Sequence, residues 1–355
     1  MSAALHGLTV LERGWLSSNN ILIHPVAGEP GAVLVDTGHV VHAEQTVALV
    51  QRALRGLTVL ERGWLSSNNI VIHAAAGEPG AVLVDTGHVS HAEQTVALVR
   101  HALRGEKLHR IVNTHLHSDH CGGNAALQRA FGAPITVPPG NADAVASWDA
   151  MRLTHAATGQ SSERFTHADT LSPGAHVVAG GRRWEALAAP GHDPFSLMLF
   201  DARHGVLISA DALWENGFGV VFPEIDGEPG FDDVGAVFDA IERLPVSVVI
   251  PGHGAPFTDV AAALARARSR LDGFKSQPER HARHAVKVMI KYHVMEERRI
   301  GHDALLHWAA ATPFLLAAWR LFGGGTPPRE WCARFVDELI GQGVLAREGD
   351  QVIDR

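Results

Sequence analysis

The segment Thr114-His115-Leu116-His117-Ser118-Asp119-His120-Cys121-Gly122-Gly123 decides how the rest of this sequence is interpreted. Its first two residues end the stretch 109–115, which predicts a short strand. Zinc and similar metals bind imidazole nitrogen and carboxylate oxygen. Because side chains alternate along an extended chain, His115 and His117 point the same way. Asp119 and His120 follow in the turn and can reach a second ion, so the segment predicts a site for two metal ions.

The alternative interpretation is a histidine-rich surface loop, because the chain contains 23 histidines and most of them cannot be ligands. The predicted strand before the segment and the glycine pair Gly122-Gly123 after it favour a built site.

Three later motifs allow a family resemblance to be stated. They are Ala189-Pro190-Gly191-His192, Ser209-Ala210-Asp211 and Ile250-Pro251-Gly252-His253, and each follows a predicted strand. Together with the opening segment they resemble the ordered motifs of the metallo-β-lactamase superfamily, in particular its glyoxalase II-like branch. The resemblance covers about residues 56 to 257. It implies an α/β fold, namely a four-layer αββα sandwich, followed here by a mainly helical C-terminal domain.

The resemblance also implies a role for each matching residue. The first metal would be held by His115, His117 and His192. The second would be held by Asp119, His120 and His253, with Asp211 bridging the two ions. Asp85, in the Asp85-Thr86-Gly87 turn, matches the family's first motif and would orient the ligand loop through hydrogen bonds.

The expected chemistry follows from two cations about 3.5–4 Å apart, which can share a water and polarise a carbonyl. We expect a metal-bridging hydroxide to attack a carbonyl carbon, with Asp119 and Asp211 as the catalytic carboxylates. Asp119 would orient that hydroxide or carry its proton to the leaving group. Two divalent ions are predicted, with zinc as the first choice and iron or manganese as alternatives.

A tandem duplication precedes this region. Residues 7–55 recur as residues 56–104, and the two copies differ only at Leu22, Pro25, Val26, Val41, Gln51 and Arg52 of the first. Each copy predicts three strands and a helix, the helix of the second copy lying over 91–103. Only the second copy is joined directly to the strand predicted over 109–115, which leads into the proposed ligands. Placing the first copy beside that strand would require looping out a whole repeat. We therefore expect the second copy to occupy the sandwich. The first would pack outside, extend a sheet edge or exchange with another subunit, unless it is a gene-assembly artefact.

The repeat and the motifs together predict a chain with three parts. Residues 1–55 are the extra copy, residues 56–257 the catalytic domain and residues 258–355 a helical, winged-helix-like domain. Strands are predicted at 176–181, 183–191, 197–202, 205–211 and 246–252, and a small hairpin at the C-terminus. The apolar stretch 304–319 is interpreted as a buried helix pair, because it is shorter than the roughly 20 residues of a membrane span.

Some other polar residues have two interpretations. Cys121 is expected to be a buried filler rather than a ligand, and His88 and His91 to have helix-start and turn roles rather than to form another metal pair. His281, His284 and Lys287 lie on a predicted cationic helix. They are either a solvated face or a set that holds an anionic group of the substrate.

The composition of the chain argues against some classes of binding partner. The formal net charge of −8 argues against nucleic acid and anionic membranes as partners. The C-terminal residues 275–355 carry 12 Lys and Arg against 10 Asp and Glu, so a lid or homodimer surface is favoured there over a DNA reader. The two cysteines and the lack of a signal-peptide pattern at the N-terminus predict a reducing, cytoplasmic location.

The predicted function is hydrolysis of a small-molecule thioester, lactone or related carboxyl derivative. One alternative is a mononuclear iron oxygenase of the persulfide-dioxygenase type, which shares much of the ligand set. A nuclease of the same superfamily is disfavoured by the acidic balance. β-Lactam hydrolysis remains open, although nothing in the sequence marks a secreted resistance enzyme.

The duplication supplies a test of the assignment of Asp85. Asp85→Ala should lower activity by roughly 10- to 100-fold, the usual effect of losing a residue that orients metal ligands. Asp36→Ala, the same change in the first copy, should leave steady-state activity unchanged. Equal loss from both variants would contradict the assignment.

Overall fold

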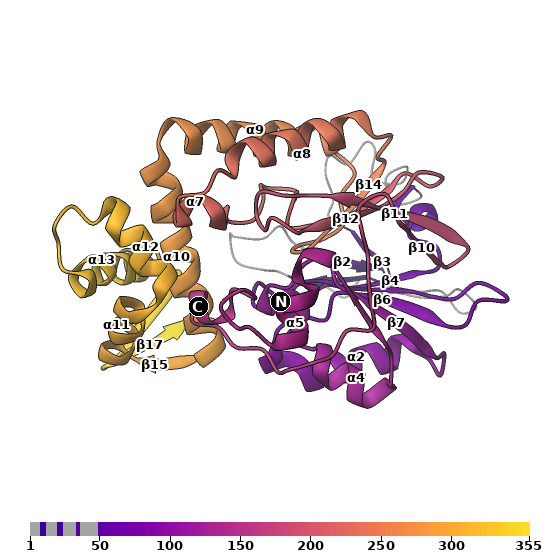
Figure 1. The fold of residues 1–355 in the computed structure, drawn as a ribbon, viewed down its shortest axis with the longest axis horizontal. Helices are drawn as coiled ribbons and strands as arrows, with labels where there is room; N and C mark the ends of the chain where they lie inside the picture. The colour runs from indigo at the N-terminus through magenta and orange to yellow at the C-terminus, as the bar shows by residue number, and fades with distance from the viewer. Residues whose placement is uncertain (1–7, 12–19, 24–32, 36–48) are drawn as a thin grey trace.

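The computed structural model describes residues 8–11, 20–23, 33–35 and 49–355 (Figure 1). Two β-sheets lie face to face between pairs of helices, so the αββα sandwich is confirmed (Figure 1). The first sheet has the order β4-β5-β6-β7-β8-β9 and the second the order β10-β11-β12-β13-β14.

The strands of the first sheet are β4 Leu57–Leu60, β5 Asn69–Ile72, β6 Ala81–Val84, β7 Leu108–Val112, β8 Ile135–Val137 and β9 Asp169–Thr170. The strands of the second are β10 His176–Ala179, β11 Arg182–Ala188, β12 Leu197–Asp201, β13 Val206–Ala210 and β14 Val248–Pro251. In the first sheet, β4, β5 and β6 pair antiparallel, and β6, β7, β8 and β9 pair parallel. In the second, only β13 and β14 pair parallel. The strands predicted after the repeat all form.

Alternation along the strands builds the layers. In β6, Val82 and Val84 face the second sheet and pack in the core that contains Trp184. Leu83 faces the opposite way and packs beneath the helices α2 Ala92–Leu103 and α4 Asn124–Phe131. This two-residue period is why a short apolar strand such as β6 contributes to two cores.

Helices cover both outer faces. Those on the first sheet are α2 Ala92–Leu103 and α4 Asn124–Phe131, with the short helices α3 Ser118–Cys121, α5 Ala142–Ser147, α6 His155–Thr158, η2 Val89–His91 and η3 Pro139–Asn141 in nearby connections. Those on the second are α8 Phe231–Arg243 and α9 Val260–Ser276, preceded by α7 Phe222–Asp226.

The structure moves the predicted domain boundary. Residue 258 was expected to open the C-terminal domain, but α9 packs through Ala263, Leu264 and Phe274 in the same core as β12 and α8. Helix α9 therefore belongs to the sandwich, and the helical unit begins at α10 Pro278–Glu297. The sequence pattern of α9 could not show which unit it belongs to. Apolar residues at helical spacing indicate a buried face, but they do not indicate which neighbouring element covers that face.

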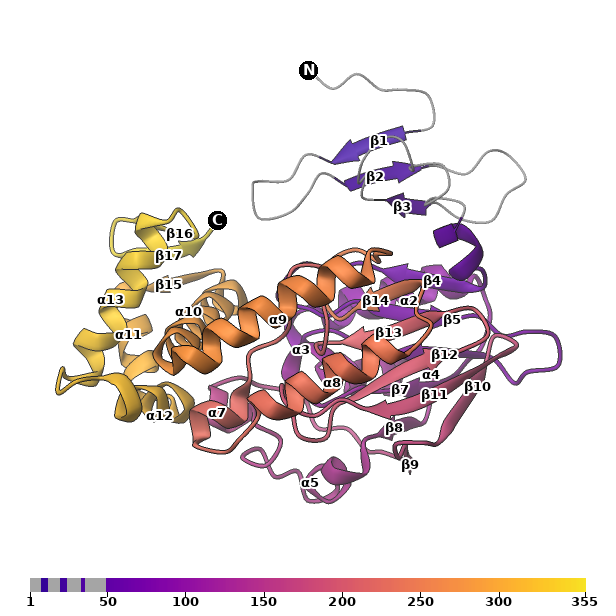
Figure 2. The same ribbon diagram turned by 90° about the horizontal axis from the view of Figure 1, so that it is seen from above.

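The C-terminal unit has its own core beside the sandwich (Figure 2). It comprises α10 Pro278–Glu297, β15 Arg299–Gly301, α11 His302–Ala311, α12 Pro313–Phe322, α13 Pro328–Gly341, β16 Leu345–Glu348 and β17 Gln351–Asp354. The predicted helix pair and hairpin are confirmed, whereas β15, which joins the hairpin as a third strand, was missed. Among the described residues no single helix is long and apolar enough to cross a membrane. Only α11 and α12 together, bent by 75°, have that length and composition.

The second copy of the repeat occupies the sandwich, as expected. Its strands β4, β5 and β6 pair with β7, whereas β1 Leu8–Leu11, β2 Asn20–Ile23 and β3 Val33–Val35 form a separate sheet (Figure 2). The described strands of the first copy do not extend either sheet of the sandwich. Val50 and Ala53, near the junction of the copies, are buried, and Ala53 joins the core between the sheets.

Removal of residues 1–48 should therefore leave the sandwich folded. We expect the melting temperature to change by less than about 4 °C, which corresponds to about 1 kcal/mol in a domain of this size. A chain lacking 56–104 instead joins the first copy to the ligand strand and should also fold, because the copies are nearly identical. Thermal unfolding of both chains measures this. Loss of a cooperative transition in the first would show that the extra copy is required.

Candidate metal centre

The predicted ligands come together at one edge of the two sheets because each follows the end of a strand. His115 and His117 follow β7, and His192 follows β11 after a short turn. Asp211 comes directly after β13, and His253 lies two residues beyond β14. Parallel pairing of β6 with β7 and of β13 with β14 places these ends side by side.

Two glycines let the backbone approach these side chains closely. A Cβ on Gly252 would lie 2.2 Å from Asp211 Oδ1, and a Cβ on Gly219 would lie 2.4 Å from His192 Nδ1. Any side chain at either position would displace a predicted ligand.

The first group of donor atoms consists of His115, His117 and His192, whose ligand atoms lie within 4.8 Å of one another. His192 Nδ1 donates a hydrogen bond to the Val220 carbonyl at 2.5 Å, so its Nε2 is the nitrogen that faces the group. That Nε2 lies 2.8 Å from His117 Nδ1. The buried Nε2 of His115 has no hydrogen-bond partner.

The second group consists of Asp119, His120, Asp211 and His253, again within 4.8 Å. His253 Nε2 lies 3.0 Å from Asp119 Oδ2. His120 Nδ1 donates to Asp85 Oδ2 at 2.7 Å, which leaves its buried Nε2 without a hydrogen-bond partner and directed at Asp211 and Asp119.

Asp211 lies between the two groups. Its Oδ2 is 3.3 Å from His192 Nε2, and its Oδ1 is 3.3 Å from His120 Nε2. Trp214 Nε1 also donates to Oδ1, at 3.3 Å. One carboxylate therefore presents one oxygen to each group.

Electrostatics differ between the two donor groups. Burial and the neighbouring histidines hold the pKa values of His115 and His117 well below the ordinary histidine value. Burial opposes charge on His120 and Asp119 as well, but the nearby carboxylates hold the pKa of His120 well above its usual value. His120 and His253 in turn lower the pKa of Asp119 to about 2. Neutral imidazoles beside ionised carboxylates are the donor set that divalent cations bind, so these residues fit a metal centre.

Asp85 makes the contacts that an orienting role requires. Its carboxylate accepts hydrogen bonds from the Thr114 backbone N–H at 2.9 Å and hydroxyl at 2.7 Å, in addition to the one from His120 Nδ1. It thereby ties the end of β6 to both ends of the ligand loop. The backbone at Asp85 has φ of 56°, in the left-handed region, which aims the side chain at that loop.

Asn68 fixes the His253 loop in a similar way and was missed by the sequence analysis. Its Nδ2 donates to the carbonyls of Pro251 at 3.0 Å and Gly254 at 2.7 Å, and its backbone N–H donates to the Gly252 carbonyl at 2.7 Å. Asparagine is common in loops, and these contacts join residues more than 180 positions apart. No local pattern could have revealed them.

The residues proposed to hold an anionic group have other partners. His281 is buried and its Nε2 accepts from the Val221 N–H at 3.2 Å, with burial lowering its pKa to about 4. His284 accepts from Arg270 at 2.6 Å, and burial beside that cation lowers its pKa to about 3. Lys287 pairs with Glu338 at 2.7 Å. The two histidines are therefore neutral packing residues, and the predicted cationic set does not form.

The other predictions concern Cys121 and His88. Cys121 is buried, its Sγ–H donates to the Leu116 carbonyl at 3.4 Å, and burial raises its pKa, so it is the expected filler. His88 caps the start of η2 by accepting from the Ser90 N–H at 3.3 Å, which is the expected helix-start role.

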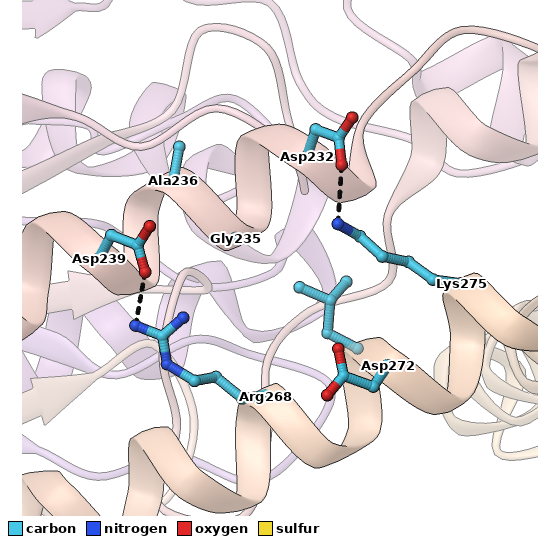
Figure 3. A pocket seen from close by; sticks show the side chains of 8 residues that line it. Asp232, Gly235, Ala236, Asp239, Arg268, Asp272 and Lys275 are labelled. Carbon is cyan, nitrogen blue, oxygen red and sulfur yellow. Dashed lines mark hydrogen bonds and ion pairs between the residues drawn. The ribbon is translucent and has the colours of Figure 1, made fainter.

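A surface hollow of about 450 Å³ lies between α8 and α9 (Figure 3). Ion pairs cross it, Asp232 with Lys275 at 2.7 Å and Asp239 with Arg268 at 2.6 Å. Its lining includes none of the residues of the two donor groups. We therefore assign the chemistry to the buried donor groups and not to this hollow.

Comparison with known proteins now places the chain in a family. Residues 62–253 match the model of the metallo-beta-lactamase superfamily, which is more than half of the chain. The chain belongs to that superfamily.

Relatives with curated names point in the same direction. The chain is similar to a hydroxyacylglutathione hydrolase of Rhodobacter capsulatus, 30% identical over 151 residues, or 41% of this chain and 48% of that protein. A second, from Anaeromyxobacter dehalogenans, is 30% identical over 168 residues, 45% of this chain and 56% of that protein. The chain thus spans about half the length of the curated relatives it matches.

Solved structures support the fold. A beta-lactamase domain protein from Burkholderia ambifaria is 22% identical with a TM-score of 0.50, covering 85% of this chain and 93% of that one. A metallo-beta-lactamase HARLDQ motif mutant from Cronobacter sakazakii is 18% identical with a TM-score of 0.50, covering 63% and 97%.

Asn68→Ala tests the support of the His253 loop. The buried Pro251 carbonyl and the more exposed Gly254 carbonyl would lose their donor. We therefore expect a loss of about 1–3 kcal/mol in unfolding free energy, mainly from Pro251, and weaker metal retention. Urea denaturation and metal analysis after dialysis measure the two effects. Asn19→Ala, the same change in the first copy, is the matched control and should leave both unchanged. Unchanged metal retention in Asn68→Ala would contradict the role assigned to Asn68.

Proposed function

We propose that this chain is a binuclear metal-dependent hydrolase of a small thioester, lactone or related carboxyl derivative. The observation that carries the proposal is the position of Asp211, which presents one oxygen to each donor group at 3.3 Å. The names of the similar curated proteins, which are hydroxyacylglutathione hydrolases, support the reaction class.

The proposed ligands divide as the donor groups do. His115, His117 and His192 would hold one ion, and Asp119, His120 and His253 the other, with Asp211 shared. Two divalent ions held there would supply Lewis acidity toward a carbonyl and lower the pKa of a water molecule. Imidazole and carboxylate donors suit zinc, and also iron or manganese.

The chain's own groups would position the reactants. Asp119 is the most exposed side chain of the second group, at 13%, and with its low pKa it is ionised at neutral pH. It can therefore accept a hydrogen bond from the attacking water and hold that water in place. Asp85 contributes indirectly, by holding His120 and Thr114 in orientation.

The mononuclear oxygenase alternative uses only one of the two donor groups. The second group has four donors within 4.8 Å, and the buried Nε2 of His120 lacks a hydrogen-bond partner, which favours a second ion. The cytoplasmic location stays a prediction, supported by two buried cysteines that form no disulfide.

Metal content and hydrolysis, measured together, test the function. We expect two ions per chain in the wild type, one or fewer in Asp211→Ala, and a loss of hydrolysis of roughly 100-fold or more in that variant. The substrate panel contains thioesters, lactones and β-lactams. Asp303→Ala, which changes a carboxylate that is 91% exposed, is the control.

Two results would contradict the proposal. One is a single iron per chain with oxygen consumption, which would support the oxygenase. The other is protein loaded with two metals that hydrolyses no member of the panel.

A further inference from the structure

Aromatic side chains border the second donor group. Trp64 stacks on His253 with ring centroids 5.5 Å apart and planes at 14°. Trp214 meets both rings edge-on, at 5.5 Å from Trp64 and 5.4 Å from His253. Trp64 is 53% exposed, so half of its large apolar surface lies open beside a proposed metal ligand.

A second aromatic pair borders the first donor group. The Phe222 ring, at the start of α7, lies 4.9 Å from His117 and 5.4 Å from His192. Phe314, from α12 of the C-terminal unit, packs against Phe222 at 4.9 Å. The two donor groups are thus flanked by aromatic rings, one pair on each.

The exposed surface of Trp64 does not stabilise the fold, because an aromatic ring stabilises a folded protein when it is removed from water. A ligand that covered such a ring would gain that free energy instead. Sites for small molecules are typically lined by apolar and aromatic groups around a few polar ones, which is the arrangement here.

The residues of α10 first considered for an anionic group are not free to hold one. His281 is buried, burial lowers the pKa of both His281 and His284, and Lys287 is paired with Glu338. Arg283 on the same helix also binds Glu338, at 2.7 Å.

We propose that the substrate is an uncharged carboxyl derivative with an apolar acyl chain or ring, held between the Trp64–Trp214 pair and the Phe222–Phe314 pair. This inference rests on the proposed function and adds to it the chemical class of the substrate. Trp64 and Phe222 are assigned as specificity-determining residues. The reacting carbonyl would lie over the donor groups, with apolar portions extending along the rings.

Binding of product-like alkyl carboxylates tests the inference without a reaction. Calorimetric titration of metal-loaded protein with acetate, butyrate, hexanoate and octanoate should show affinity rising about three- to fourfold for each added CH₂ that reaches a ring. S-methylglutathione, which carries two carboxylates and an ammonium group, serves as the polar comparison and should bind more weakly than octanoate. Equal affinity along the series, or tighter binding of S-methylglutathione, would overturn the proposal.

Substitution of the ring residues tests whether the rings cause the dependence of affinity on chain length. Trp64→Ala and Phe222→Ala should each reduce the gain in affinity from acetate to octanoate by at least about tenfold, with the affinity for acetate retained. Trp15→Ala, the same change in the first copy, is the control for Trp64. Leu321→Ala, which removes a 52% exposed side chain on α12, is the control for Phe222 and Phe314. An unchanged chain-length dependence in both ring variants would contradict the assignment.

Hydrolysis of thioesters and lactones with acyl chains of increasing length separates this inference from the reaction class. Catalysis without a chain-length preference would sustain the proposed function and overturn the inference. A chain-length preference in binding, without hydrolysis of any of these thioesters or lactones, would sustain the aromatic site and overturn the reaction class.

Discussion

Burial of seven ionisable side chains at one edge of two sheets is the constraint on which the rest of this structure depends. Removing carboxylates from water costs several kcal/mol each unless opposite charge replaces the lost hydration. Within the two donor groups the sources of positive charge are imidazoles, and burial depresses the pKa of two of them. Divalent cations held there would resolve the conflict, because neutral imidazole and ionised carboxylate would then both be in their preferred states. The hydrogen bonds from Asp85 and Asn68 hold the loops in place for that purpose.

Much of this arrangement could be predicted from the sequence, because it depends on local rules. Short apolar runs ended by turn residues predicted the strands. The ligands were found because the motifs that follow these runs resemble those of the metallo-β-lactamase superfamily. The helix predicted over 91–103 forms as α2, Ala92–Leu103. The fold class followed from the order of the motifs and is confirmed by the family match.

What the sequence could not provide are contacts between distant segments. The ring of Trp64 meets His253 only because two sheets bring together residues almost 190 positions apart, and neither residue has a neighbour that indicates it. The cationic interpretation of α10 failed for the same reason. His281 and His284 look like charged surface residues in the sequence, but both rings pack against Phe274, and His281 is buried against the loop that carries Val221.

The C-terminal unit contacts both flanks of the proposed site. Phe314 supports Phe222, and Tyr292 of α10 donates a hydrogen bond to the Leu65 carbonyl at 3.1 Å, one residue from Trp64. None of the proposed metal ligands comes from this unit. The last stretch of the gene therefore supplies residues that support the rings of the proposed substrate site, but no metal ligand. Sequence change in the last 80 or so residues would alter how Trp64 and Phe222 are held and would leave every proposed metal ligand in place.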